Sequence, residues 1–173
     1  EHYDKVHKYL SAIENVKKIT DPSVLCPIIS QFRLNREHIP TPMLNHVSVW
    51  NALLENMPIT AMIRNLGSMS AKGVLDDPDM VKLINDKLTN QEILHKGRVH
   101  PMAVFFAWKT YQSGHGFRGS NCWTVNTTIA DTLINDTFKL CYKNVKPSGR
   151  RILVGLDISG SMGNAIIGNP MIS

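Results

Sequence analysis

The chain has 173 residues, of which 43% are hydrophobic and 19% are charged, and its formal net charge is +5. This composition supports a hydrophobic core and excludes a disordered tail, and the length allows one domain or one domain and part of a second. The longest apolar stretch, around "AVFFAW", is far shorter than the roughly 20 residues of a membrane span, so we expect no membrane contact. The basic excess favours an anionic partner such as RNA, and an ordinary basic surface explains it equally well.

The cysteines and the start of the sequence indicate the cellular compartment of the protein. Cys26, Cys122 and Cys141 are far apart and form no CxxC pair, a pattern that indicates reduced thiols in a cytosolic protein. The chain begins with a polar segment at Glu1 and shows no signal or transit peptide. We therefore predict a cytoplasmic protein, with the nucleus as an alternative location, whose sequence is clipped at its start.

Prolines at positions 22, 42, 58, 78 and 101 divide the chain into helical segments. Three of them follow a residue that caps helices, in Asp21-Pro22, Thr41-Pro42 and Asp77-Pro78. Apolar residues recur at helical spacing in segments 3–16, 25–32, 44–54, 59–66, 81–88, 102–111 and 129–141. The sequence therefore predicts a row of amphipathic helices, the last of them long and capped by Asn126 or Thr127.

The spacing of alternate prolines predicts a repeat. Pro22 and Pro58 are 36 residues apart, as are Pro42 and Pro78, and Pro58 and Pro101 are 43 apart. A period near 40 built from two helices is typical of HEAT-like or armadillo-like arrays, which usually bind partners rather than catalyse reactions. The alternative is an irregular all-α bundle, because only the prolines recur at this spacing and the residues between them do not repeat.

The segment "GHGFRG" at residues 114–119 matches the GxGxxG pattern of dinucleotide-binding folds. That fingerprint must follow a strand, whereas the preceding segment has helical spacing. Gly114 is better interpreted as the end of a helix, followed by an exposed loop that carries His115 and Arg118. This loop is either a phosphate contact or a structural turn.

The helical pattern stops at Pro147-Ser148-Gly149, and "ILVGLD" at residues 152–157 then predicts a short buried strand of a parallel sheet. Asp157, Ser159 and Ser161 follow in a DxSxS arrangement. Hard cations such as Mg²⁺ prefer oxygen ligands, and ligands gather at the carboxyl ends of strands. The pattern is therefore similar to the metal-ion-dependent adhesion site of a von Willebrand factor A domain. The alternatives are a polar turn or a helix cap, whereas the GxSxG elbow of hydrolases is absent.

Three longer segments carry a more specific resemblance: "VWNALLENMPITAMIRNLGSMS", "RVHPMAVFFAWKTYQSGHGFRG" and "LVGLDISGSM". They resemble the Ro (SS-A) ribonucleoprotein family, whose members share the TROVE module, and the resemblance runs through nearly the whole chain. It implies a mainly α fold in which HEAT-like repeats form part of a ring, followed by the first strand and metal loop of a von Willebrand factor A domain. We expect residues 1–146 to belong to the helical module and 147–173 to be the linker and the start of a truncated A domain.

The resemblance also implies a function. The family binds Y RNAs on the outside of its ring and takes single-stranded ends of misfolded noncoding RNAs, such as defective 5S rRNA precursors, into its hole. It acts in RNA quality control without catalysis, and no nucleophile–base pair of an enzyme is visible in this sequence. As RNA-binding candidates we name Arg64, Arg118, Arg150 and Arg151; a solvated helix face is the favoured alternative for Arg64.

The implied metal site is incomplete. Of the family's ligands for a divalent cation, expected to be Mg²⁺, only Asp157, Ser159 and Ser161 are in this chain, because a Thr and an Asp come from later loops. A rival to RNA binding is a non-enzymatic scaffold whose A domain binds a protein partner through the metal.

Overall fold

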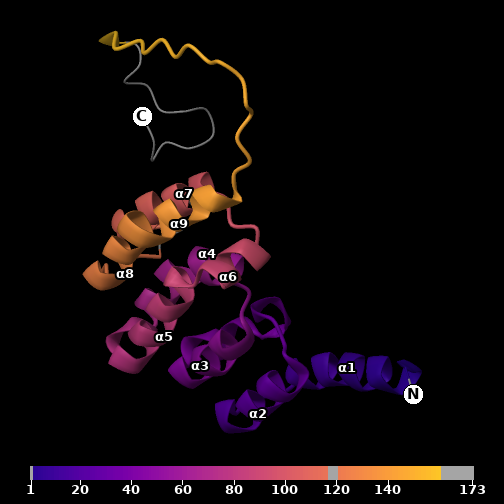
Figure 1. The fold of residues 1–173 in the computed structure, drawn as a ribbon. Helices are drawn as coiled ribbons and strands as arrows, with labels where there is room; N and C mark the ends of the chain where they lie inside the picture. Colours follow the sequence, from indigo (N-terminus) through magenta and orange to yellow (C-terminus); the bar gives the residue numbers. More distant parts are fainter. Residues whose placement is uncertain (1, 117–120, 161–173) are drawn as a thin grey trace.

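The computed structural model describes residues 2–116 and 121–160, and the helical part of the chain forms a stack from which residues 145–160 run away (Figure 1). The first helices are α1 (His2–Val16), α2 (Pro22–Phe32), α3 (Val47–Asn56) and α4 (Ile59–Ala71). They are followed by α5 (Pro78–Thr89), α6 (Gln91–Lys96), α7 (Pro101–Gln112), α8 (Thr127–Thr132) and α9 (Phe138–Cys141). Within the described ranges, no helix combines the length and apolarity that a membrane span requires.

Side-chain caps begin the helices where the sequence predicts them. The carboxylate of Asp21 accepts a hydrogen bond from the backbone N–H of Ser23 at 2.8 Å, and α2 begins at the following proline. Asp77 caps α5 in the same way, at 2.9 Å from the N–H of Asp79. The side chain of Asn126 caps α8 at 3.2 Å. A side-chain acceptor satisfies an N–H group that has no partner within the helix, so these starts are determined locally.

The helix predicted to start at Thr41-Pro42 is different in the structure. Residues Thr41–Asn45 form a 3₁₀ turn, η2, and α3 begins only at Val47. The buried indole N–H of Trp50 donates to the carbonyl of Leu44 at 2.8 Å. In a continuous α-helix that carbonyl would accept from the backbone four residues on. The tertiary contact of Trp50 therefore takes the place of the helical hydrogen bond.

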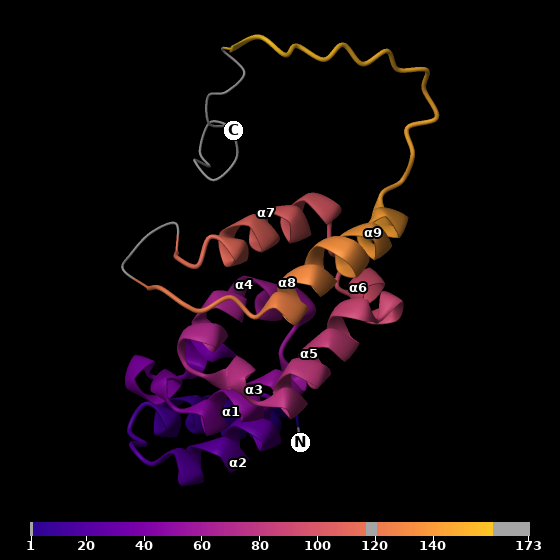
Figure 2. The same cartoon turned by 90° about the vertical axis from the view of Figure 1, so that its left-hand side faces the viewer.

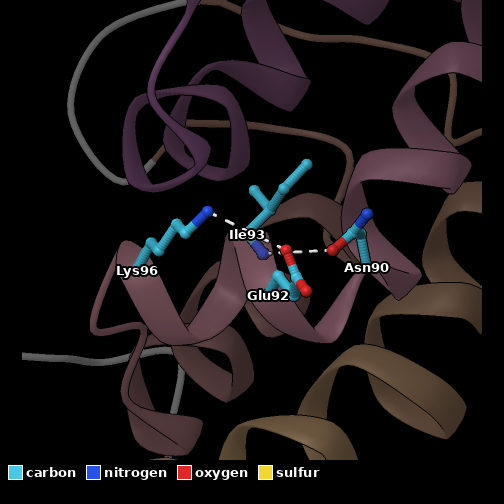
Figure 3. A network of polar contacts seen from close by, with 4 residues as sticks. All are labelled: Asn90, Glu92, Ile93 and Lys96. Atoms are coloured by element: carbon cyan, nitrogen blue, oxygen red, sulfur yellow. Dashed lines mark hydrogen bonds and ion pairs between the residues drawn. The ribbon is translucent and has the colours of Figure 1, made fainter.

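The short helix α6 was not predicted, because six residues are too few to show a helical period. Its start is capped by Asn90, whose side-chain oxygen accepts from the N–H of Ile93 at 3.1 Å (Figure 3). Glu92 and Lys96, one turn apart, form an exposed ion pair at 3.8 Å. Such exposed pairs contribute little, on the order of 0.3–0.5 kcal/mol, so the cap and the buried Leu94 hold this helix.

The last predicted helix is confirmed as one continuous element with a wider turn in its middle. The π-helical turn η4 (Leu133–Thr137) joins α8 to α9. The fully buried Thr137 donates its hydroxyl to the carbonyls of Thr132, at 3.2 Å, and of Leu88 in α5, at 3.1 Å. The hydroxyl can therefore satisfy a carbonyl in the last turn of α5, where backbone partners are missing.

Helices that lie three labels apart in the chain pack against each other (Figures 1 and 2). Helix α4 contacts α7, α5 contacts α8 and η4, and α6 contacts α9. Helix α4 starts at Ile59 and α7 at Pro101, so the distance between these two starts is close to the spacing of Pro58 and Pro101 in the sequence. A single hydrophobic core, which includes the buried side chains of Trp50, Met62, Leu66, Leu88 and Tyr111, runs through the stack. The prediction of a mainly α fold is confirmed.

The strand predicted at residues 152–157 is wrong for the structure. These residues adopt no strand, and Leu153 and Leu156 are 100% and 86% exposed. A strand of a parallel sheet needs neighbouring strands on its edges to pair its backbone groups. The described part of the chain contains only an isolated bridge between His115 and Cys122, and nothing there can pair with this segment.

Candidate functional site

A cavity of about 470 Å³ lies between α4, α7 and the segment that follows α7. Its walls include polar and aromatic side chains from all three elements, among them Arg64, Ser68, Phe106, Thr110, Asn121 and Trp123. Arg64 supplies a positive charge, and none of the described lining residues is Asp or Glu. The volume lies in the range of small-molecule sites, and the lining suits an aromatic, electron-rich ligand better than a cation.

The segment after α7 closes on itself. Gly114 has a φ of +72°, a left-handed conformation that glycine adopts without strain, so its predicted role at the helix end is confirmed. The N–H of Trp123 donates to the carbonyl of Gly114 at 2.9 Å, and the N–H of Gly116 to that of Asn121 at 3.0 Å. Because a helix and not a strand precedes Gly114, the GxGxxG match does not form a dinucleotide site.

Three contacts fix Trp123 in the wall of the cavity. Its indole N–H donates to the carbonyl of Tyr111 at 2.9 Å. Its ring stacks on that of Tyr111, with centroids 6.3 Å apart and planes at 11°. Its opposite end packs on Gly67, where a Cβ atom would lie 2.7 Å from Cη2 of the indole. Contacts within the chain therefore hold this part of the wall in place.

Arg64 is where three hollows of the surface meet. It is exposed on α4, and its Nε donates to the carbonyl of Thr60 at 3.3 Å. It lines the large cavity, a second of about 310 Å³ beside Ala103, and a third of about 290 Å³ beside Arg36. The interpretation of Arg64 as a plain solvated helix face is therefore incomplete, because the residue lines three hollows of the surface.

Arg36 is a candidate that the sequence analysis missed. It lies in the 3₁₀ turn η1 (Arg36–His38) and lines the hollow that it shares with Arg64. Its Nε is buried and has no hydrogen-bond partner among the described residues. A buried N–H donor without an acceptor costs free energy, and an anion that accepted a hydrogen bond from it would lower that cost. Its chain neighbours Leu34, Asn35 and the acidic Glu37 line the same hollow. No short-range pattern around Arg36 signals the site, since the remaining walls come from α3, α4 and the turn between them.

Three of the four predicted RNA-binding arginines lie in the described part of the chain, and Arg64 is not brought together with Arg150 and Arg151. Arg118 lies outside the described residues. Arg150 and Arg151 are exposed in the segment that leaves the helical stack, where the N–H of Arg150 donates to the hydroxyl of Ser148 at 3.3 Å. Of the three that the structure describes, Arg64 alone borders the cavity.

Two of the predicted metal residues, Asp157 and Ser159, form a tight polar turn. The N–H of Ser159 donates to the carboxylate of Asp157 at 2.9 Å. This bond, and a weaker contribution from the Ser159 side chain, hold the pKa of Asp157 below its ordinary value, so the carboxylate is ionised at neutral pH. Ser161 lies outside the described residues, and the described ones contain no group of three or more His, Cys, Asp or Glu suited to a metal. The oxygen donors fit a hard cation in kind, but a carboxylate and one hydroxyl are too few to hold it firmly.

Comparison with known proteins places this architecture in a family. The TROVE domain matches residues 32–147, which is most of the chain and includes all three hollows. The chain belongs to the TROVE domain family. The match covers helices α3 to α9, so the packed pairs α4 with α7, α5 with α8 and α6 with α9 are all parts of a TROVE domain.

Two relatives, one from an animal and one from a bacterium, are similar to the chain over most of its length. The chain is 36% identical to the RNA-binding protein RO60 of Caenorhabditis elegans over 163 residues, which are 94% of the chain and 25% of that protein. It is 32% identical to the RNA-binding protein RO60 of Deinococcus radiodurans over 158 residues, 88% of the chain and 29% of that protein. The chain thus spans between a quarter and a third of the length of these relatives.

A solved structure is similar as well. The crystal structure of the Deinococcus radiodurans RO (RSR) protein superposes with a TM-score of 0.73 over 81% of the chain and 28% of the RO chain, at 27% identity. Together with the packing of α4 on α7 and α5 on α8, this similarity supports the helical fold of the TROVE domain.

Proposed function

We propose that this TROVE chain is part of an RNA-binding protein and that the surface around Arg64 contacts the RNA. The observation that carries the proposal is the meeting of three hollows at one exposed arginine, with half-buried aromatic rings in the wall of the largest. The names of the RO60 relatives, which describe them as RNA-binding proteins, support it.

The chemistry of the surface suits single-stranded RNA. Arginine forms charge-assisted hydrogen bonds to phosphate, and unpaired bases stack on aromatic side chains. Arg64 and Arg36 would contact the backbone, and the half-buried rings of Phe106 and Trp123 are available to bases. A net charge of +5 assists the approach of a polyanion.

The resemblance to the Ro family gives the proposal a finer form. The RNAs would be Y RNAs and misfolded noncoding RNAs such as defective 5S rRNA precursors, and the role would be small-RNA quality control in the cytoplasm without catalysis. The stacked repeats would form part of a ring in the intact protein. Residues 1–146 would belong to this helical module, and residues 147–173 would begin a von Willebrand factor A domain.

The metal site is a separate part of the proposal. Asp157, Ser159 and Ser161 would supply three of the oxygen ligands of a divalent cation, expected to be Mg²⁺, and later segments would complete the site. The ionised carboxylate of Asp157 supports this. The cation, when bound, would offer an open coordination position to a carboxylate of a protein partner, which is the basis of the alternative function as a scaffold.

A gel-shift titration of the intact protein separates these functions. We expect a Y-type RNA and a single-stranded RNA to bind, and the affinity to fall steeply with salt because phosphate contacts release counterions. Binding of a protein partner that requires Mg²⁺ and survives ribonuclease would support the scaffold instead. An RNA affinity that is absent at low salt would overturn the proposal of RNA binding.

A further inference from the structure

We propose that the cavity between α4, α7 and Trp123 is a pocket for one unpaired nucleobase of a bound RNA strand. This inference rests on the proposed RNA binding and assigns a specific role to one cavity. The cavity of about 470 Å³ accommodates a base and part of its sugar. Its lining contains Arg64 and no described acidic residue, which fits a ligand joined to phosphates and does not fit an ammonium or a metal ion.

Two aromatic side chains in the wall are accessible to a base. Phe106 and Trp123 are half-buried and line the cavity, whereas Tyr111 is 2% exposed and lies behind the ring of Trp123. Trp123 is held by its bond to the carbonyl of Tyr111 and by the backbone at Gly67. A ring that is fixed in advance loses little conformational entropy when a base stacks on it.

Polar groups in the same wall could read the edge of the base. The side chains of Ser68 and Asn121 line the cavity and have no hydrogen-bond partner among the described residues. Thr110 donates to the carbonyl of Phe106 at 2.9 Å, so its oxygen is still able to accept. A hydroxyl and an amide each offer a donor and an acceptor, as the edges of nucleobases require.

The position of Arg64 determines where the strand would run. It lies at the border between the base cavity and the hollow that it shares with Arg36. A phosphate on Arg64 would place its base in the large cavity and the neighbouring nucleotides along the smaller hollows. Arg36, with no acceptor for its Nε in the described residues, lies in the direction of the next phosphates.

The test measures the affinity of the intact protein for short single-stranded oligoribonucleotides in which each position in turn lacks its base. We expect one abasic position to weaken binding about tenfold, the effect of losing one base–aromatic stack. The substitution Ala107→Leu narrows the cavity and should weaken binding of the complete oligonucleotide about tenfold as well. In this variant the abasic position should have no further effect.

A matched control is Ala71→Leu, at an exposed position of α4 that lines none of the three hollows, and it should bind like the wild type. A persistent abasic effect in Ala107→Leu would overturn the pocket. If Ala107→Leu does not fold, the wild-type protein is tested instead. 5-Iodouridine is placed at the oligonucleotide position whose missing base weakens binding, and its photocrosslink is mapped on the protein. A crosslink to Phe106 or Trp123 supports the inference, and a crosslink elsewhere overturns it.

The outcome also separates this inference from the proposed function. An oligonucleotide that binds with the same affinity whichever base is missing leaves RNA binding intact and overturns the pocket alone. If Ala107→Leu loses the binding of a protein partner while its affinity for the oligonucleotide is unchanged, the cavity is a protein-binding site and the nucleobase pocket is overturned. No binding of any oligonucleotide at low salt overturns both proposals.

Discussion

The indole of Trp123 occupies the space that a side chain at Gly67 would need. A Cβ atom at position 67 would lie 2.7 Å from Cη2 and 2.8 Å from Cζ2 and Cζ3 of the ring. The two residues are 56 positions apart, and their contact fastens the segment after α7 to the middle of α4. The glycine in this helix therefore has a packing function.

The substitution Gly67→Ala tests this relationship. Alanine is the better helix former by about 1 kcal/mol, and on that ground alone it would stabilise α4. The overlap with the indole costs about 1–3 kcal/mol of overpacking, so after the gain in helix propensity we expect the free energy of unfolding to be lower by up to about 2 kcal/mol. Urea denaturation measures it, and Trp123 should become more exposed to fluorescence quenchers.

Gly155→Ala is the matched control, because a Cβ atom there would meet nothing within 4 Å. We expect its free energy of unfolding to equal that of the wild type. A Gly67→Ala variant that is more stable than the wild type by about 1 kcal/mol, the gain in helix propensity alone, would contradict the packing role of Gly67.

Thr137 links the π-helical turn to the end of α5. In Thr137→Val the isosteric side chain loses the hydroxyl that donates to the buried carbonyls of Leu88 and Thr132. An unsatisfied buried carbonyl costs about 1–3 kcal/mol, so we expect destabilisation of this size in thermal or urea unfolding. The exposed Thr128, on the first turn of α8, gives the control substitution Thr128→Val, which should change stability by less than about 0.5 kcal/mol.

Cys141 makes stability depend on pH. Burial raises the pKa of its thiol from 9.0 to about 11, so the unfolded chain loses this proton first as pH rises. Its contribution is present in full below pH 9 and is lost as pH rises to 11, by roughly 2–3 kcal/mol. Urea titrations across this range should show the loss in the wild type and a smaller one in Cys141→Ala.

Thiol reactivity provides an independent measurement for Cys141. The thiolate is the reactive form, and Cys141 is both buried and high in pKa, whereas Cys122 is exposed. A thiol reagent at pH 8 should modify Cys122 rapidly and Cys141 only on unfolding. Equal rates at the two positions would show that Cys141 is not buried in solution.

Arg64 should contribute one phosphate contact to RNA binding. For Arg64→Gln we expect the slope of log affinity against log salt concentration to become smaller by about one, with weaker binding at low salt. Lys17→Gln removes the same charge at a position that lines none of the three hollows, and it should retain the wild-type slope. An unchanged slope in Arg64→Gln would remove Arg64 from the interface. A filter-binding titration at four salt concentrations provides the slopes.

Several features follow from the sequence itself. The starts of α2, α5 and α8 depend on a capping side chain and, in two of them, a proline within one or two residues. The end of α7 depends on the freedom of Gly114 to adopt a positive φ. These signals act over a single turn of backbone, so reading them requires no knowledge of the fold.

Other features were decided only by the tertiary structure. The delayed start of α3 depends on the hydrogen bond from Trp50 to Leu44. The wall of the large cavity depends on the packing of Trp123 against Gly67, and Arg64 lines this cavity and the two smaller hollows. Residues 152–157 have the composition of a buried strand and remain exposed, because the described chain provides no strand to pair with them. The sequence by itself determined most of the helices and the limits that carry a local cap, since those backbone groups are satisfied within one turn. The tertiary structure decided the site, since its walls come from segments that are distant along the chain.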